Sequence, residues 1–240
     1  MDFTFSEAEQ AYREKARAWI REHVPAWWRD ADAHEFDEED AMFEGVRRWH
    51  QDLYDAGYVG VTWPVEYGGQ GRGHVENALL QEELVVQDAP PVTNGLGIGL
   101  CGPAIIHHGS EAQKKRFLRP MLRAEEMWCQ GYSEPGAGSD LAAVRTRARP
   151  VPDGGWVIDG VKVWSSYAHL AQLCLLLART DPDAKKHAGI SYLLVPMRQT
   201  GIEVRGIVQP DGTDEFNEVF FDGARCPKDN VLGGLNDGWK

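Results

Sequence analysis

A glycine-rich polar loop, Ser133–Asp140 with the sequence SEPGAGSD, has the chemical character of a phosphate-binding segment. Gly136 and Gly138 have no side chains, so a ligand can approach the backbone closely. The hydroxyl groups of Ser133 and Ser139 add donors, and consecutive backbone N–H groups in such a turn can bind an anion. The loop is neither a P-loop, because no Gly-Lys-Ser/Thr follows, nor a G-x-G-x-x-G motif. A tight connection between strands that simply requires glycine would have the same composition.

The stretch VKVWSS, residues 161–166, is a second candidate site. Trp164 stands at the end of a predicted strand and is followed by Ser165 and Ser166. A tryptophan in this place can stack on a planar ring while the hydroxyl groups bond to the ring's edge. The chain has nine tryptophans, most of which must pack in the core, so Trp164 alone also fits a packing role.

The elements that must position these two segments change character near Glu126. Before it, apolar residues recur at helical spacing, and Ser6 with Glu9 matches a capping box that begins the first helix. After it, short runs rich in Val, Ile, Leu, Trp and Phe alternate with turn signals, and Leu173–Leu177 is apolar enough to be a strand buried on both faces. The pattern predicts an α+β protein with an all-α helical domain over residues 1–125 and a β domain over 126–240.

The composition of the chain disfavours some classes of binding partner. The chain has 240 residues, 42% of them hydrophobic, and a formal net charge of -12. This acidity disfavours nucleic acid and anionic membranes, because both select clustered cations. The sequence contains no apolar run of membrane-spanning length, and its acidic N-terminus does not resemble a secretory signal.

The four cysteines are far apart and form no C-x-x-C pair. They suggest neither a zinc site nor a disulfide framework, so we expect no metal and a reducing, cytoplasmic location. Each is most simply a small buried hydrophobic residue.

Taken together, QGYSEPGAGSDLAAVRTRA and GVKVWSSYAHLAQLCLLLART resemble the FAD-dependent acyl-CoA dehydrogenase family. Three further stretches, GVTWPVEYGGQGRG, GISYLLVPMRQTGIEVR and NEVFFDGARCPKDNVLGGLNDGW, extend the resemblance over nearly the whole chain. It implies an N-terminal helical domain, a β-barrel-like middle domain that binds FAD and acyl-CoA, and a role in fatty acid and lipid metabolism. The family's C-terminal helical domain is expected to be absent from these residues.

The resemblance also implies roles for individual residues. FAD would lie along Gln130–Ser139, with its ring beside Tyr132 and Trp164, and Ser139 would also approach the acyl-CoA. Asp140 is expected to order the loop through an Asx-type turn, and Lys185 to lie near the adenosine phosphate of CoA unless its loop is simply solvated. The predicted cofactor-binding residues are Gln130, Gly131, Tyr132, Ser133, Gly138, Ser139, Trp164, Ser165 and Ser166.

In the implied reaction a carboxylate removes the α-proton of the acyl thioester and the β-hydrogen passes as hydride to the flavin, leaving a trans-2-enoyl-CoA. The family's catalytic glutamate is expected beyond Lys240, so no catalytic residue is assigned in this chain. Glu134 belongs to the loop that shapes the flavin site and is not expected to be the base. Expected partners are an electron-transfer flavoprotein or similar acceptor and further subunits, either in a homo-oligomer (dimer or tetramer) or in a hetero-oligomer.

Two alternatives remain open from sequence. One is a different reaction on the same architecture, as in an acyl-CoA oxidase or a flavin monooxygenase of the superfamily. The other is a non-catalytic companion subunit that stabilises an active dehydrogenase partner.

Overall fold

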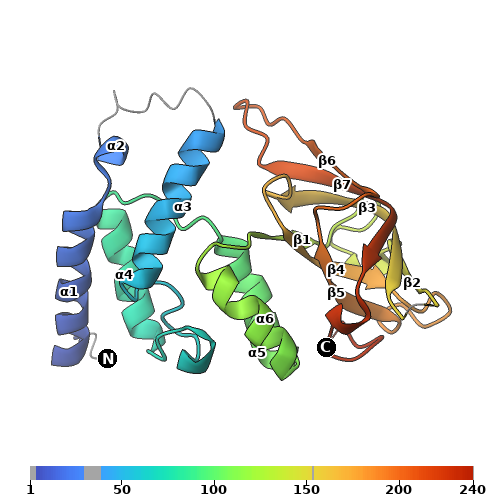
Figure 1. The fold of residues 1–240 in the computed structure, drawn as a ribbon, viewed down its shortest axis with the longest axis horizontal. Helices are drawn as coiled ribbons and strands as arrows, with labels where there is room; N and C mark the ends of the chain where they lie inside the picture. The colour runs from blue at the N-terminus through green and yellow to red at the C-terminus, as the bar shows by residue number, and fades with distance from the viewer. Residues whose placement is uncertain (1–3, 30–38, 153, 240) are drawn as a thin grey trace. The chain divides into compact units, whose positions relative to one another are not determined.

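The computed structural model describes residues 4–29, 39–152 and 154–239, which divide into two compact units (Figure 1). The first unit extends to Gly95 and includes residues 122–125, and the second contains residues 96–121 and those from 126 onward. Helices followed by a sheet-rich region agree with the expected fold class. The domain boundary at residue 125 remains a prediction, and residues 96–121 group with the sheet.

Apolar residues recur on one face of the first helix of this unit, as its helical prediction requires. Ser6 caps the first helix as predicted: Glu9 N–H donates to Ser6 Oγ at 3.3 Å, and Ser6 N–H donates to the Glu9 carboxylate at 2.7 Å. Tyr12, Ala16 and Ile20, spaced four apart, form its buried face. The elements are α1 (Glu7–His23), α2 (Ala26–Arg29), α3 (Glu39–Asp55), the 3-10 turn η2 (Val65–Tyr67) and α4 (His74–Val86).

The second unit combines helices with one mixed sheet. Its helical elements are the π-helical turn η3 (Gly97–Cys101), α5 (Gly102–His108), α6 (Glu111–Leu122) and the 3-10 turns η4 (Leu141–Ala143) and η5 (Lys228–Asn230). Its strands are β1 (Trp128–Gly131), β2 (Arg147–Pro150), β3 (Trp156–Ser166), β4 (Leu173–Arg179), β5 (Ile190–Pro196), β6 (Ile202–Gly206), β7 (Phe216–Cys226) and β8 (Val231–Leu232).

The strand order is β6-β7-β3-β2-β4-β5-β8, and β1 pairs in parallel with β4. The sheet is therefore open, with β6 and β8 at its ends, and the expected barrel-like domain is not closed. Residues 173–178 of β4 are all buried, which confirms the strand predicted to be covered on both faces. Its position between β1, β2 and β5 explains that burial, because only an interior strand is shielded on every side.

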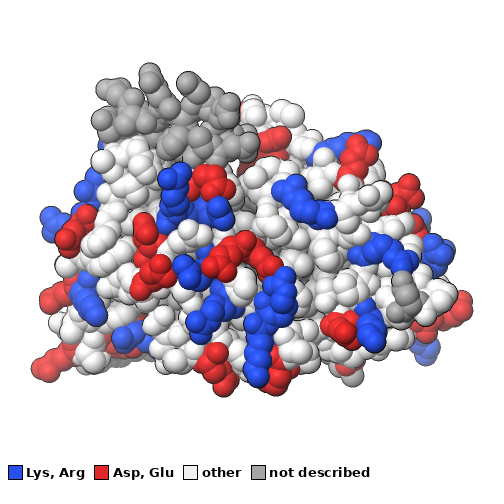
Figure 2. Space-filling model, viewed as in Figure 1, with Lys and Arg blue, Asp and Glu red and all other residues white. Residues whose placement is uncertain are grey.

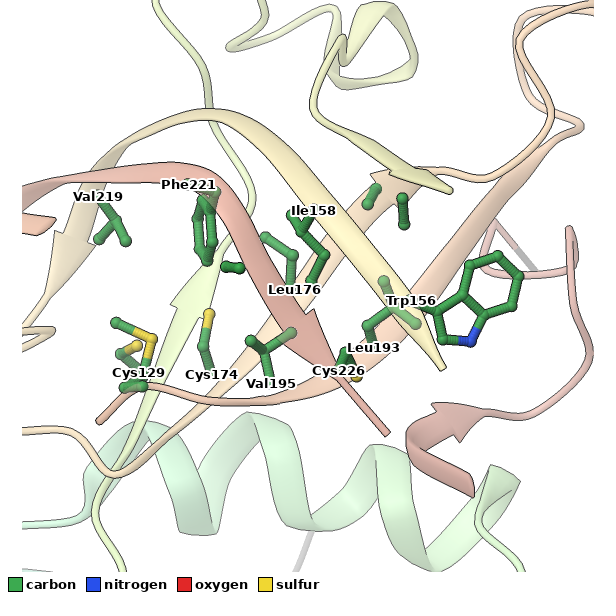
Figure 3. Close-up of a cluster of buried hydrophobic side chains, with 14 of the residues drawn as sticks. Cys129, Trp156, Ile158, Cys174, Leu176, Leu193, Val195, Val219, Phe221 and Cys226 are labelled. Carbon is green, nitrogen blue, oxygen red and sulfur yellow. The ribbon is translucent and has the colours of Figure 1, made fainter. Parts of the chain in front are cut away.

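Apolar side chains from β1, β3, β4, β5 and β7 form the core of this unit (Figure 3). Cys129, Cys174 and Cys226 belong to this cluster, and Cys101 is also buried. None of the four cysteines forms a disulfide, which confirms their predicted role as small buried residues.

Charged side chains of both signs are interspersed on the face shown in Figure 2. Among the described residues, none of the helices combines the length and apolar character that a membrane crossing needs.

Candidate functional site

The loop that follows β1 begins as a tight turn. Glu134 and Ala137 exchange two backbone hydrogen bonds, each 3.0 Å long, so the four residues EPGA double back on themselves. Gly136 and Gly138 are exposed, and a Cβ added at either would meet nothing within 4 Å. The backbone of this turn is therefore open to an approaching ligand, as the sequence predicted.

Trp164 is presented by a β-bulge in β3. Lys162 pairs with Val219 of β7, but the next pair along the ladder is Ser165 with Asn217, so two residues of β3 stand opposite one of β7. Trp164 adopts a left-handed backbone conformation with φ of 61°, and its side chain is 55% exposed. Its indole meets Phe216 edge-on, with ring centroids 5.9 Å apart. Trp164 therefore has a strained backbone and an exposed side chain that is supported from one side. Its other side is suited to stack on a planar ring.

The chain after the bulge is fixed by Asn217, which is fully buried. Its Oδ1 accepts a hydrogen bond from the backbone N–H of His169 at 3.1 Å, and its Nδ2 donates to the carbonyl oxygen of Asp214. Tyr167, also left-handed with φ of 53°, donates its N–H to the carbonyl oxygen of Glu215 at 2.7 Å. These bonds hold the unusual backbone that follows Trp164 against β7 and the loop before it.

The two predicted segments meet through the backbone. Val163 N–H donates to the carbonyl oxygen of Ser133 at 2.9 Å, which joins the start of the loop to β3 beside the bulge. Gln130 and Gly131 end β1, and Tyr132 and Ser133 follow directly. Those four residues therefore lie on the strand end that adjoins the Trp164 segment.

Tyr132 also borders a pocket of about 400 Å³ in the second unit. Its ring lies 5.7 Å from that of Tyr192, centroid to centroid, and burial together with a hydrogen bond shared with Tyr192, which favours the protonated hydroxyl, raises the pKa of Tyr132. The pocket's other walls come from η3, α5, β8 and the chain after β8, including Leu100, His107 and Gly238. Tyr192 was missed from sequence because only the sheet brings β5 and the end of β1 together, on the two sides of β4.

Beneath the loop lies an ion pair that the sequence interpretation did not find. Lys162 Nζ, on a side chain with no exposed area, donates to Glu134 Oε1 and to the carbonyl oxygen of Tyr132, both at 2.9 Å. Burial would raise the pKa of Glu134, but the Lys162 charge and hydrogen bonds from Lys162, Thr146 and Arg145 hold it below its usual value. One sequence signal was present: Lys162 shares the inward parity of Trp156 and Ile158 along β3.

The far end of the loop differs from expectation. The Asp140 side chain makes no capping hydrogen bond to the turn that follows, so the predicted Asx-type role is wrong. Its carboxylate instead pairs with Lys186 Nζ at 2.6 Å, in a bridge whose two side chains are more than half exposed. This contact brings the lysine loop, residues 181–189, to the end of the glycine loop, and Lys185 lies exposed in that same loop. Lys185 therefore lies in a loop that reaches the glycine loop, but Lys186 is the lysine that contacts Asp140, and a phosphate contact of Lys185 stays a prediction.

Two family models match this chain. The model described as acyl-CoA dehydrogenase, N-terminal domain, matches residues 6–125, and the one described as acyl-CoA dehydrogenase, middle domain, matches residues 129–224. The chain belongs to the acyl-CoA dehydrogenase family. Acyl-CoA dehydrogenases are FAD-dependent oxidoreductases of lipid metabolism, which agrees with the resemblance seen in the two motifs.

Similar proteins are longer than this chain. Acyl-CoA dehydrogenase IpdE1 of Mycobacterium tuberculosis is 47% identical over 230 residues, which is 92% of this chain and 60% of that protein. Mitochondrial isovaleryl-CoA dehydrogenase of Pongo abelii is 28% identical over 97% of this chain and 54% of its own length. The chain thus spans little more than half the length of these acyl-CoA dehydrogenases.

Solved structures of the family share the fold. The ChsE4-ChsE5 complex from Mycobacterium tuberculosis contains a chain 31% identical, with a TM-score of 0.85 over 100% of this chain and 59% of that one. The Tcur3481-Tcur3483 steroid ACAD contains a chain 34% identical, with a TM-score of 0.82 over 100% of this chain and 60% of that one.

Proposed function

We propose that this chain forms the FAD- and acyl-CoA-binding part of an enzyme that dehydrogenates an acyl-CoA thioester to the trans-2-enoyl-CoA. The observation that carries the proposal is the backbone bond from Val163 to Ser133, which joins the glycine loop and the Trp164 segment into one surface. Family membership supplies the chemistry, since FAD when bound accepts the two reducing equivalents.

The residues present fit FAD. The open backbone at Gly136 and Gly138 suits the close approach of a pyrophosphate, and exposed Trp164 suits the flat isoalloxazine ring. Ser165 is only 1% exposed, and its Oγ has no hydrogen-bond partner among the described residues. A buried hydroxyl without a partner is unfavourable and supports a role in binding a polar group beside the bulge.

Within this proposal each residue of the chain has a limited task. Gln130, Gly131, Tyr132 and Ser133 border the ring, Trp164 supports its face, and Ser165 and Ser166 donate to its edge. Gly138 and Ser139 bind the pyrophosphate end, and Ser139 also orients the thioester. Lys185 attracts the phosphate of CoA, which its exposure next to the Asp140–Lys186 bridge permits.

We propose that the proton-abstracting carboxylate comes from outside residues 1–240. Glu134 is unsuitable because its oxygens already accept from Lys162, Arg145 and Thr146 inside the protein. Asp140 is paired with Lys186 at the loop's outer end. A base must reach its proton within hydrogen-bonding distance, and neither carboxylate is free to do so.

A hetero-oligomer is a second element of the proposal. The ChsE4-ChsE5 and Tcur3481-Tcur3483 structures each name two proteins, and one chain of each structure resembles this one over its whole length. A companion subunit would supply the base, and the steroid ACAD suggests steroid-like acyl thioesters as the first substrates to test.

Titration of the chain with FAD tests the binding proposal. Saturable quenching of flavin fluorescence at one FAD per chain is expected, and riboflavin, which lacks the pyrophosphate and adenosine, should bind far more weakly. Absence of saturable binding, both alone and with candidate partner subunits, would contradict it. Turnover of steroid-like and short branched acyl-CoA with an artificial acceptor identifies a dehydrogenase, whereas stoichiometric peroxide formation identifies an oxidase.

A further inference from the structure

The buried pair Glu134–Lys162 has no role in the reaction proposed above, yet it lies directly under the glycine loop. We infer that these two residues are positioning residues, which set the place of loop 133–139 relative to the bulge at Trp164. The inference deepens the proposed function and rests on it for the identity of the ligand. The pair's effect on the loop itself is independent of any ligand.

The contacts of the pair converge from three segments. Lys162 comes from β3, and its Nζ bonds at 2.9 Å to the carbonyl oxygen of Tyr132 at the end of β1. Glu134 comes from the loop, and its carboxylate accepts the backbone N–H groups of Arg145 at 2.7 Å and Thr146 at 2.9 Å, just before β2. One ion pair therefore connects the loop's entry, the chain beyond its exit and the strand that carries Trp164.

The same pair defines the geometry of the turn. The side chain of Glu134 points into the protein while its backbone N–H and carbonyl form the two bonds to Ala137. Fixing this carboxylate therefore fixes the turn that presents Gly136 and Gly138. Lys162 is next to Val163, whose N–H donates to the carbonyl oxygen of Ser133. Two neighbouring residues of β3 therefore hold the start of the loop.

Both side chains of the pair are shielded from solvent. The Lys162 side chain has no exposed area and that of Glu134 is 7% exposed, so water cannot replace a lost partner. A neutral pair of similar volume could fill the space, but it would lack the ammonium group that donates to the Tyr132 carbonyl and the second carboxylate oxygen that accepts an N–H group. If the pair only stabilises the fold, a neutral replacement that folds should leave the loop and FAD binding unchanged. If the pair positions the loop, the same replacement should loosen the loop and weaken FAD binding.

The test uses Glu134→Gln, Lys162→Met and the double variant. The single variants each leave a buried charge unpaired and can fail to fold, whereas the double variant leaves none. We expect the folded double variant to bind FAD with a Kd raised at least about tenfold (~1.4 kcal/mol), and with a changed absorption band shape of the bound flavin. In the flavin-free chain, amide exchange at Ala137, Thr146 and Val163 should accelerate about tenfold or more.

Arg149→Met is the matched control. It breaks the Arg149–Asp159 bridge, 2.6 Å long, which also joins a basic to an acidic side chain in this sheet but is exposed. Its Kd for FAD and its amide exchange should stay within about twofold of wild type, because an exposed bridge contributes little. A folded double variant with exchange and binding within twofold of wild type would overturn the inference. If wild type binds no FAD, the proposed function fails, and amide exchange in the flavin-free variants still decides the positioning role.

Discussion

The backbone N–H of Val163 donates to the carbonyl oxygen of Ser133 at 2.9 Å. This bond joins two segments that are separate in the sequence, one glycine-rich and one ending in an exposed tryptophan. It places the β-bulge of β3 beside the start of the loop. The predictions below test what each side of this junction contributes and how the helical unit responds to pH.

Trp164→Ala should weaken FAD binding without unfolding the protein. The side chain is 55% exposed, so its loss removes little core packing, but it also removes the proposed platform for the isoalloxazine ring. We expect the Kd for FAD to rise about tenfold, or ~1.4 kcal/mol, with most of the loss recovered by Trp164→Phe. Fluorescence titration measures the Kd.

Trp239→Ala is the control for that substitution, because Trp239 is 42% exposed in the same unit. Its Kd should stay within about twofold of wild type, since one exposed aromatic residue outside the site contributes little to binding. Equal effects of the two substitutions, or an unchanged Kd in Trp164→Ala, would count against the platform role.

Substitution of glycine should separate binding from stability. At Gly138 a Cβ would meet nothing within 4 Å, so Gly138→Ala should change the free energy of unfolding by less than about 0.5 kcal/mol while weakening FAD binding. At Gly160 a Cβ would lie 2.5 Å from Thr146 Oγ1 on a backbone with φ of +151°. Gly160→Ala should therefore lower the free energy of unfolding by about 1–3 kcal/mol.

Urea unfolding and FAD titration of both glycine variants check this division. If the Gly138→Ala variant binds FAD as tightly as wild type, the open backbone at this position is not a ligand contact. Gly160→Ala with wild-type stability would show that the strand can shift to accept the extra carbon.

The stability of the first unit should fall as the pH drops below about 6.5. His50 is fully buried; its Nε2–H donates to the carbonyl oxygen of Leu122 at 2.7 Å, and its Nδ1 accepts from Thr93 Oγ1 at 3.2 Å. Burial lowers the pKa of His50 from 6.5 to about 4, although the bond to Leu122 opposes the shift. The unfolded chain therefore binds the proton first, and stability is lost between these two pKa values, by about 2 kcal/mol at pH 5.

The measurement is urea unfolding followed by tryptophan fluorescence at pH 7 and pH 5. Other carboxylates titrate in this range, so the decisive comparison is with His50→Gln, which retains a donor for the Leu122 carbonyl but does not titrate. The variant should lose less stability than wild type on going from pH 7 to pH 5. Parallel losses in the two proteins would assign the pH dependence to other groups.

The sequence by itself determined the features that depend on local chemistry. The capping box of Ser6 and Glu9, the fully buried run of β4 and the change from helices to strands follow from propensity and periodicity, which neighbouring residues set. The glycine loop and the Trp164 segment were found in the same way, because their residue types and spacing are properties of short stretches.

Only the tertiary structure decided how those stretches meet. Strict alternation along β3 would turn Trp164 inward with Ile158 and Lys162, and the bulge against β7 turns it outward instead. The sequence likewise left open which lysines pair with Glu134 and Asp140, because more than one lysine could reach this loop. Strand register buries Lys162 under the loop, where an unpaired charge would be unfavourable, whereas the connection between β4 and β5 brings the half-exposed Lys186 to the loop's end.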